Sequence, residues 1–464
     1  MNLRTLTVAE AEKIATESSP DPASAATGRK SPYPPGATNA NWFNLFNAIS
    51  WQITMGSPAI LYAKSQGASE TILGIIAAFT PLLSIFQLPA AKYLPKYGYR
   101  RFILAGWGTR TLFIFGIAAV PLLSFVPAGG KLALLLLCLF SFNLVRGITA
   151  GAWWPWISEL IPEHLRGRFL SRDQVFTQIG SLTAIMAAAI ILHGHAQPWQ
   201  FTVVFLISAA GATVSLLFLN RTPDTTSPEN IKRSGHRVPW GQMLAYRPFL
   251  HLVIFNLIYL TATQALAVFP LAYLRTVAHY SEGNILWLFT SGLLGALVTV
   301  PLNGRIADRY GSKPVMRACV AVWITLVIGW FLISSRYLHY GVALVAVFDL
   351  LYGIAYTNYN IANNRLAMAT MPLMGRNHFF ALYTVFVSLA SGLSPIGWGL
   401  LLDVIGPYEH TTGVLSWNRY SIYFACVLIL AISAGIYSTY LTENVRKPRQ
   451  PSATPLPTST GASA

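Results

Sequence analysis

The chain has 464 residues, of which 54% are hydrophobic and 10% are charged, and its formal net charge is +16. A typical soluble protein carries about 25% charged residues, so this composition excludes a soluble domain. The apolar runs repeatedly reach the roughly 20 residues that cross the hydrocarbon core of a bilayer. Lys and Arg collect mainly in alternate loops, which favours membrane topology over nucleic-acid binding as the reason for the positive charge.

Residues 1–41 are polar and rich in Pro, Ser and Ala, and we expect them to form a disordered cytoplasmic tail. No apolar core follows the first Met, so the sequence predicts no cleavable secretory signal. Six apolar spans follow in residues 42–219, which we expect to fold as an N-terminal half. These spans are Trp42–Ala63, Thr71–Tyr93, Phe102–Phe125, Leu132–Ser158, Val175–His193 and Phe201–Leu219.

Residues 220–247 are the longest interior connection and predict a polar cytoplasmic linker. Six further spans fill residues 248–441, the predicted C-terminal half, and residues 442–464 are expected to form a second disordered tail. The chain is therefore predicted to be an all-α polytopic membrane protein with twelve transmembrane helices. The second set of spans is Phe249–Leu274, Ile285–Asn303, Val315–Ser334, Gly341–Ala367, Phe379–Leu402 and Tyr420–Leu441.

The loop charges predict the orientation. The loops on one side hold only scattered cations, Lys64, Lys131, Arg275 and Arg336. The loops on the other side, together with the linker and the C-terminal tail, are basic, so both termini are expected in the cytoplasm and the protein in the plasma or inner membrane. The cations of this second side include Lys96, Arg100, Arg101, Arg166, Arg168, Arg172, Arg305, Arg309, Lys313, Arg317, Arg376, Arg446, Lys447 and Arg449.

A short basic turn occurs twice between apolar runs, at residues 91–100 and, more completely, at residues 304–314. Its second glycines, Gly98 and Gly311, are 213 residues apart. A second landmark repeats 210 residues apart, since Pro162 and Arg166 recur as Pro372 and Arg376. Two landmarks with nearly equal offsets predict a duplicated protein built from two related halves.

With these residues the chain resembles the major facilitator superfamily of secondary transporters. That family's motif between spans two and three reads Gly-x-x-x-Asp-Arg-x-Gly-Arg-Lys/Arg, often with a weaker copy between spans eight and nine. Here the second copy is the better one, although Ser312 departs from the motif, and the first copy has Ala91 and Pro95 where Gly and Asp are expected. The matching residues are Gly304, Asp308, Arg309, Gly311 and Lys313 in the second copy and Lys96, Gly98 and Arg100 in the first.

The resemblance implies two pseudo-symmetric six-helix halves and a cytoplasmic gate at this turn. We take the matching residues, together with Arg166 and Arg376, as candidates for that gate. Gly304 and Gly311 permit close helix approach and a turn with positive φ. By the family's pseudo-symmetry, Asp308 is expected to face the start of span five, near Arg168, Arg172 or Gln174. The alternative is that Arg309 and Lys313 only enforce topology.

Polar side chains at mid-membrane are costly and usually line a cavity. They recur at helical spacing on the predicted spans one, four, seven and ten, and in the superfamily these same spans line the central cavity. The candidate cavity residues are Asn44, Asn47, Trp51, Asn143, Arg146, Trp153, Asn256, Tyr259, Gln264, Asp349, Tyr352, Tyr356 and Tyr359.

Four of the intramembrane side chains have competing interpretations. Arg146 is expected to face water, an anion or a carboxylate, because an unpaired guanidinium costs about 2.5 kcal/mol or more; the alternative is a structural bond to carbonyls. Asp349 is the candidate for proton coupling, or else a solvated residue near the cavity mouth. Arg110 is expected to pair with a carboxylate or to snorkel. Trp153 offers a stacking surface for a sugar-like or aromatic substrate, or belongs to the interfacial belt.

The sequence therefore predicts a secondary transporter, proton-coupled or facilitative, for a small polar organic solute such as a saccharide or an organic anion. The alternatives are an efflux transporter of amphiphilic compounds and a transport-inactive sensor or scaffold on the same fold. The nine histidines are scattered and the three cysteines lack metal-ligand spacing, so no enzyme, metal or other cofactor is predicted. The expected partners are the solute and the lipid bilayer but no nucleic acid, and the protein is expected to work as a monomer.

Overall fold

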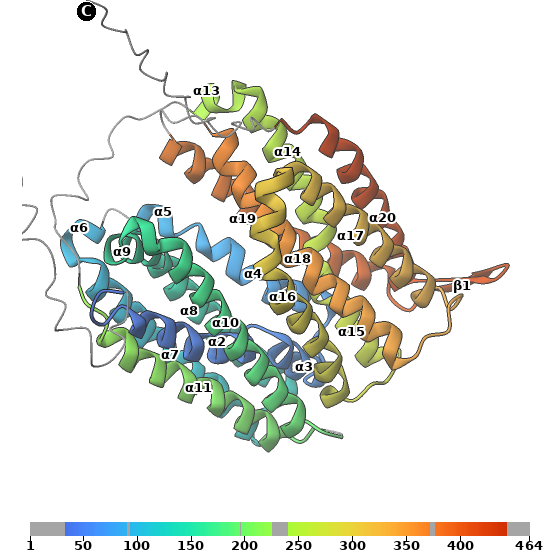
Figure 1. Ribbon diagram of the computed structural model, residues 1–464. Helices are drawn as coiled ribbons and strands as arrows, with labels where there is room; N and C mark the ends of the chain where they lie inside the picture. The colour runs from blue at the N-terminus through green and yellow to red at the C-terminus, as the bar shows by residue number, and fades with distance from the viewer. Residues whose placement is uncertain (1–32, 91–92, 195, 225–239, 372–375, 443–464) are drawn as a thin grey trace, which may run out of the picture.

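The computed structural model describes residues 33–442, apart from 91–92, 195, 225–239 and 372–375. The side chains of residues 95, 158, 163–164, 166–167, 171, 240, 242, 300–310 and 376–377 also lie outside the described part. The helices form two bundles that follow each other along the chain, from blue to green and from yellow to red in Figure 1. Among the described residues, ten helices are long and apolar enough to cross a membrane. The prediction of an all-α polytopic membrane protein is confirmed.

The N-terminal half contains the six predicted spans, three of them interrupted. The first is split into α2 and α3, the second into α4 and α5, and the fourth passes through a 3₁₀ turn. Its elements are α2 (Thr38–Thr54), α3 (Ser57–Ser65), α4 (Glu70–Ser84), α5 (Gln87–Ala90), α6 (Leu94–Tyr97), α7 (Tyr99–Ala119), η3 (Val120–Leu122), α8 (Ala128–Thr149), η4 (Ala150–Ala152), α9 (Trp153–Leu160), α10 (Glu163–Ile191) and α11 (Pro198–Asn220).

The C-terminal half repeats this order and adds a short hairpin, which the sequence analysis did not predict, before the last span. Its elements are α13 (Trp240–Ala245), α14 (Arg247–Thr263), η5 (Gln264–Ala267), α15 (Phe269–Thr276), α16 (Glu282–Tyr310), α17 (Ser312–Ser334), α18 (Val342–Thr370), α19 (Arg376–Ile405), β1 (Glu409–Thr412), β2 (Leu415–Asn418), α20 (Arg419–Tyr437) and η6 (Ser438–Tyr440). The strands pair antiparallel, with Thr412 opposite Leu415.

Two boundaries differ from the sequence prediction. The first helix begins at Thr38, inside the stretch 1–41 that was expected to be disordered, and Tyr33 packs edge-on against Phe169 of α10. The linker predicted over residues 220–247 includes the short helix α13. Both differences arise because polar composition alone does not reveal which flanking residues pack against a bundle.

The first and seventh spans break at equivalent positions. Pro58 stands at the second position of α3 and Pro270 at the second position of α15, 212 residues later. A proline has no N–H to donate to the preceding turn, and its ring clashes with the carbonyl there. α2 and α14 therefore end before these prolines. The shared break is further evidence of duplication.

The second glycine of each basic turn has the positive φ that the sequence predicts for Gly311. Gly98 has a φ of 72° directly before α7, and Gly311 has a φ of 82° directly before α17. In this left-handed region a Cβ costs about 1–2 kcal/mol, so glycine lets the chain turn at once into the next helix.

The basic residue two positions later has the same function in both halves. Arg100 donates to the carbonyl and side-chain oxygens of Asn220, the last residue of α11. Lys313 donates to the carbonyl oxygens of Thr439 and Leu441, at 3.0 and 2.5 Å, just beyond α20. Cations bind favourably at helix C-termini, where carbonyls lack partners. Each half thus joins its third span to the end of its last span.

The two halves meet along two helix pairs, α4 with α19 and α10 with α16. Glycines allow the backbones to touch, because a Cβ added at Gly74 would collide with the Pro395 carbonyl and one added at Gly399 with the Glu70 carbonyl. In Figure 1 the halves approach each other at the end that carries α3 and α15 and diverge toward the end that carries α9 and α13. We call the former the closed end.

Candidate functional site: a closed end and two joined cavities

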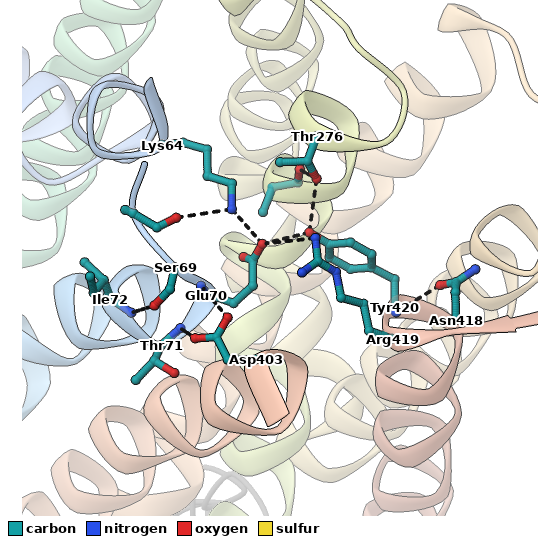
Figure 2. A network of polar contacts seen from close by, with 12 residues as sticks. Lys64, Ser69, Glu70, Thr71, Ile72, Thr276, Asp403, Asn418, Arg419 and Tyr420 are labelled. Atoms are coloured by element: carbon teal, nitrogen blue, oxygen red, sulfur yellow. Dashed lines mark hydrogen bonds and ion pairs between the residues drawn. The ribbon is translucent and has the colours of Figure 1, made fainter. Parts of the chain in front are cut away.

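A buried carboxylate, Glu70, organises the closed end (Figure 2). Glu70 is the first residue of α4 and its side chain is 1% exposed. One of its oxygens accepts bonds from Lys64 at 2.7 Å and from the Tyr420 hydroxyl at 2.9 Å, with the Arg419 guanidinium 4.0 Å away. Tyr420 in turn lies 3.2 Å from the Thr276 hydroxyl. The carboxylate therefore joins the N-terminal half to α20 of the C-terminal half.

A second carboxylate joins the same helix end to α19. Asp403 accepts the backbone N–H of Glu70 at 3.1 Å and that of Thr71 at 2.8 Å. The first N–H groups of a helix have no partner within the helix and carry partial positive charge, so an anion there is stabilising. Two N–H groups of the first turn of α4 are thus satisfied from the other half, in addition to the cap that Ser69 provides to the N–H of Ile72. The sequence analysis did not identify this contact.

The ion pair at Glu70 has a counterpart in the second half. Arg275 at the end of α15 binds Glu282, the first residue of α16, at 2.5 Å, and Glu282 is 1% exposed. The cations are 211 residues apart and the acids 212. Lys64 and Arg275, which the sequence analysis regarded as scattered loop cations, are therefore equivalent partners of buried acids. The nearly equal offsets are the signal that would have identified them.

A central cavity of about 600 Å³ lies between the halves, next to the closed end. Both halves contribute to its lining, with broken spans one and seven facing each other across it. The predicted residues Trp51, Gln264, Asp349, Tyr352 and Tyr356 all line it. Its other polar lining residues are Gln52, Ser57, Thr80, Gln174, Gln178, Thr357 and Ser391.

A second cavity of about 360 Å³ penetrates the N-terminal half and shares Trp51 and Gln174 with the central one. The predicted residues Asn44, Asn47, Trp51, Arg146 and Trp153 line it. Its remaining lining residues are Phe43, Trp107, Arg110, Ala150, Trp154, Asp173, Gln174 and Thr177. Trp153 and Trp154 therefore both line this cavity, although Trp154 is 61% exposed, and Trp156 is fully buried.

The two intramembrane arginines lie on aromatic rings. The Arg146 guanidinium carbon is 4.4 Å from the Trp51 ring centroid. The Arg110 guanidinium lies over Trp107 and Phe142, 4.5 and 5.2 Å from their centroids, and donates to the side-chain oxygen of Asn47. Among the described residues, no carboxylate lies within ion-pair distance of either guanidinium.

Asp173 is a cavity carboxylate that the sequence analysis missed. It is 8% exposed on α10 and accepts bonds from Asn44 at 2.7 Å and from Asn41 at 3.1 Å. The predicted span five began at Val175, so Asp173 was placed in a loop. The observed helix extends back to Glu163 and carries this residue into the bundle.

Asp349 occupies the interface of α18 and α16. Its carboxylate accepts the backbone N–H of Gly292 at 2.6 Å and the hydroxyl of Ser291 at 3.3 Å. No cation of the described part of the chain lies within ion-pair distance of it. A carboxylate held in this way keeps one face toward the central cavity.

Four predicted cavity residues are engaged inside their own half instead. Asn143 accepts the Thr80 hydroxyl at 2.9 Å and donates to a carbonyl of its own helix. Asn256 accepts the Tyr359 hydroxyl at 3.0 Å, and Tyr259 stacks on Tyr359 with centroids 3.6 Å apart. Asn143, Asn256, Tyr259 and Tyr359 are not among the lining residues of either cavity, so their contact with a solute stays a prediction.

The predicted gate lies only partly within the described residues. Gly304, Asp308 and Arg309 fall in the last turns of α16, and their side chains, like those of Arg166 and Arg376, lie outside the described part. The expected contact of Asp308 with the start of span five is therefore a prediction. Lys96 is exposed on α6, and Arg100 and Lys313 bind within their own halves as described above.

Comparison with known proteins relates this geometry to a family. A family model described as Major Facilitator Superfamily matches residues 42–281 and again residues 257–462. No curated protein matches the chain. Three of the solved structures that match it have TM-scores of 0.64 to 0.67. They are the nucleoside transporter NupG in a mutant form (10% identity, covering 88% of this chain and 100% of that one), a D-xylose–proton symporter (15%, 88% and 97%) and a POT family transporter in complex with 5-aminolevulinic acid (15%, 88% and 97%). At such identities the likeness is one of fold.

Proposed function

Because the chain belongs to the Major Facilitator Superfamily, we propose that it moves a small polar organic solute across the membrane by alternating access. The observation that carries this proposal is the central cavity, which is lined from both halves by amides, hydroxyls and aromatic rings. A site between two pseudo-symmetric halves becomes accessible from either side when the halves rock against each other. Polar groups beside aromatic faces suit a hydroxylated or amphoteric solute more than a purely apolar one.

We infer the orientation from charge. Arg101, Arg168 and Arg172 are exposed cations at the ends of their helices away from the closed end, and the basic side of a membrane protein faces the cytoplasm. In this proposal the closed end faces outward, and the described conformation exposes its cavity toward the cytoplasm. The Glu70 and Asp403 contacts then form the outer gate.

The most direct experiment is a thermal-shift screen of the purified full-length protein against sugars, organic acids and drugs. A solute at one hundred times its Kd stabilises the folded state by about 2.7 kcal/mol, which raises Tm measurably. The best solute is then tested for uptake into proteoliposomes. Trp51→Ala should abolish the shift because Trp51 lines both cavities, whereas Trp199→Ala, at a 58% exposed site, should not.

The outcomes separate the alternatives. Polar solutes that bind and are taken up support the proposal. Hits confined to amphiphilic drugs, with export from vesicles, favour an efflux transporter. A solute that binds the cavity without being transported under any gradient favours a sensor or scaffold on the same fold.

Asp349 is our candidate for proton coupling. It lines the cavity, and the described groups around it are donors that hold the carboxylate without neutralising it. Asp349→Asn keeps the side-chain size but cannot release a proton. We expect this variant to retain solute counterflow and to lose accumulation driven by a pH gradient. Unchanged accumulation would remove Asp349 from the coupling step.

A further inference from the structure

The feature that the proposed function leaves unexplained is the pair of arginines in the N-terminal half. Arg110 lies at the middle of α7 and is 1% exposed, and Arg146 lies on α8 and faces the same cavity. A buried charge without a counter-charge costs several kcal/mol in a protein interior. Two like charges in one cavity also repel each other, and in a medium of low dielectric constant this repulsion is strong.

The rings beneath the two guanidinium groups form one surface. Arg146 lies on Trp51 and Arg110 on Phe142, and the centroids of these two rings are only 6.1 Å apart. Cation–π contacts attract each guanidinium to its ring, but they supply no negative charge. The planar N–H edges of both groups remain the strongest hydrogen-bond donors in the cavity.

Within the described part of the chain, no carboxylate supplies the missing charge in this conformation. Asp173 is the carboxylate among the lining residues of this cavity, and the amides of Asn41 and Asn44 hold it away from ion-pair distance of either arginine. The other polar lining groups are amides and hydroxyls, which carry no charge. An anion from solution would neutralise the pair, and guanidinium groups match the paired oxygens of carboxylates and phosphates.

We infer that Arg110 and Arg146 form a subsite that holds the carboxylate or phosphate group of a small organic anion. This inference rests on the proposed transport function and specifies its substrate class. The anionic group occupies the smaller cavity, with Trp51 and Asn47 beside it. The rest of the solute extends past Trp51 and Gln174 into the central cavity, toward the amides and tyrosines of the C-terminal half.

The test compares charged solutes with neutral twins on the purified full-length protein. Thermal shift is recorded with D-gluconate against D-glucitol, with glycerol 3-phosphate against glycerol, and with inorganic sulfate and phosphate against chloride at constant ionic strength. We expect stabilisation by an oxyanion and none by its neutral twin. The gluconate and glycerol phosphate arms distinguish a carboxylate site from a phosphate site.

Variants then assign the effect to the two residues. Arg110→Gln and Arg146→Gln should each weaken the apparent affinity for the anion about ten- to hundredfold, the loss of one charged hydrogen-bonding partner. Both variants remove a buried, unneutralised charge, so their melting temperature without ligand should stay the same or rise. Arg146→Lys keeps the charge without the planar fork and should weaken binding by less. Arg101→Gln, at an exposed site on the same helix, is the matched control and should bind like the wild type.

The inference is overturned if no oxyanion of the panel stabilises the protein, if the neutral twins stabilise it equally, or if both Gln variants keep the anion's effect. Uptake into proteoliposomes separates this inference from the proposed function. Uptake of neutral polar solutes, with no binding or uptake of any anion by the wild type, would refute the anion subsite and leave the transport proposal intact. Anion binding that depends on Arg110 and Arg146 but leads to no transport would support the anion subsite and refute the transport proposal.

Discussion

The contact of Asp403 with the first turn of α4 allows a quantitative prediction about the closed end. The Asp403→Asn substitution keeps the shape of the side chain but replaces one acceptor oxygen with an amide group. One of the two backbone N–H groups, of Glu70 or Thr71, then faces a donor instead of an acceptor. The substitution also removes a negative charge from a helix N-terminus.

Published ranges for such interactions give the size of the effect. A hydrogen bond to a charged group contributes about 1.5–3 kcal/mol, and an anion at a helix N-terminus about 0.3–1 kcal/mol. Because Asp403 is partly exposed, we use the lower part of both ranges, about 2 kcal/mol. This free energy changes an equilibrium about thirtyfold, so a population of 99:1 in favour of the closed end would fall to about 3:1.

Electron–electron double resonance measures this population. Spin labels at Trp199→Cys and Tyr337→Cys report the distance between the halves at the closed end, in a background in which Cys138, Cys319 and Cys426 are replaced. Asp403→Asn should add a longer-distance component. The matched control is Glu409→Gln, which removes an acid that pairs with Arg336 inside the C-terminal half. Identical distance distributions in the two variants would refute the reasoning.

Three further substitutions test other contacts. Gly399→Ala forces a Cβ against the Glu70 carbonyl and should open the closed end in the same assay, whereas Gly397→Ala, whose added Cβ meets no atom within 4 Å, should leave it closed. Lys313→Gln should lower the free energy of unfolding by about 1 kcal/mol, and thus Tm, because the bonds to two carbonyls are lost. An equal decrease in Tm for Arg317→Gln, at an exposed site, would contradict this assignment. Asp308→Asn should reduce uptake while membrane insertion and folding stay intact, and full activity would argue against a gate at this turn.

The features that the sequence predicted well are local or periodic. Span lengths and loop charges reveal the membrane helices, and the repeated turn reveals the duplication. The positive φ of Gly311 follows from the abrupt junction of two helices. Each of these signals lies within a short segment, or in the comparison of two short segments of the same chain, so one sequence is enough to recognise it.

The features that it missed depend on which surfaces face each other. Tyr359 lies on the polar stripe of span ten and Asn256 on that of span seven. The two bond to each other, and neither is among the lining residues of the central cavity. A stripe of polar residues shows which face of a helix is polar, but it does not show which residues that face contacts. The contact between Glu70 and Tyr420 joins residues 350 positions apart, and only the folded halves bring them together.

The bonds of Arg100 and Lys313 have a mechanical consequence. Each bond joins the third helix of its half to the end of the last helix. We therefore expect each half to resist internal shear and to rotate as a rigid body. The N-terminal turn has Pro95 in place of the expected acid, yet its Arg100 reaches the last helix as Lys313 does. The N-terminal copy therefore lacks the acid from which we predict a contact between the halves, but it keeps the bond within its own half. During transport, distances inside a half should remain constant while the angle between the halves changes.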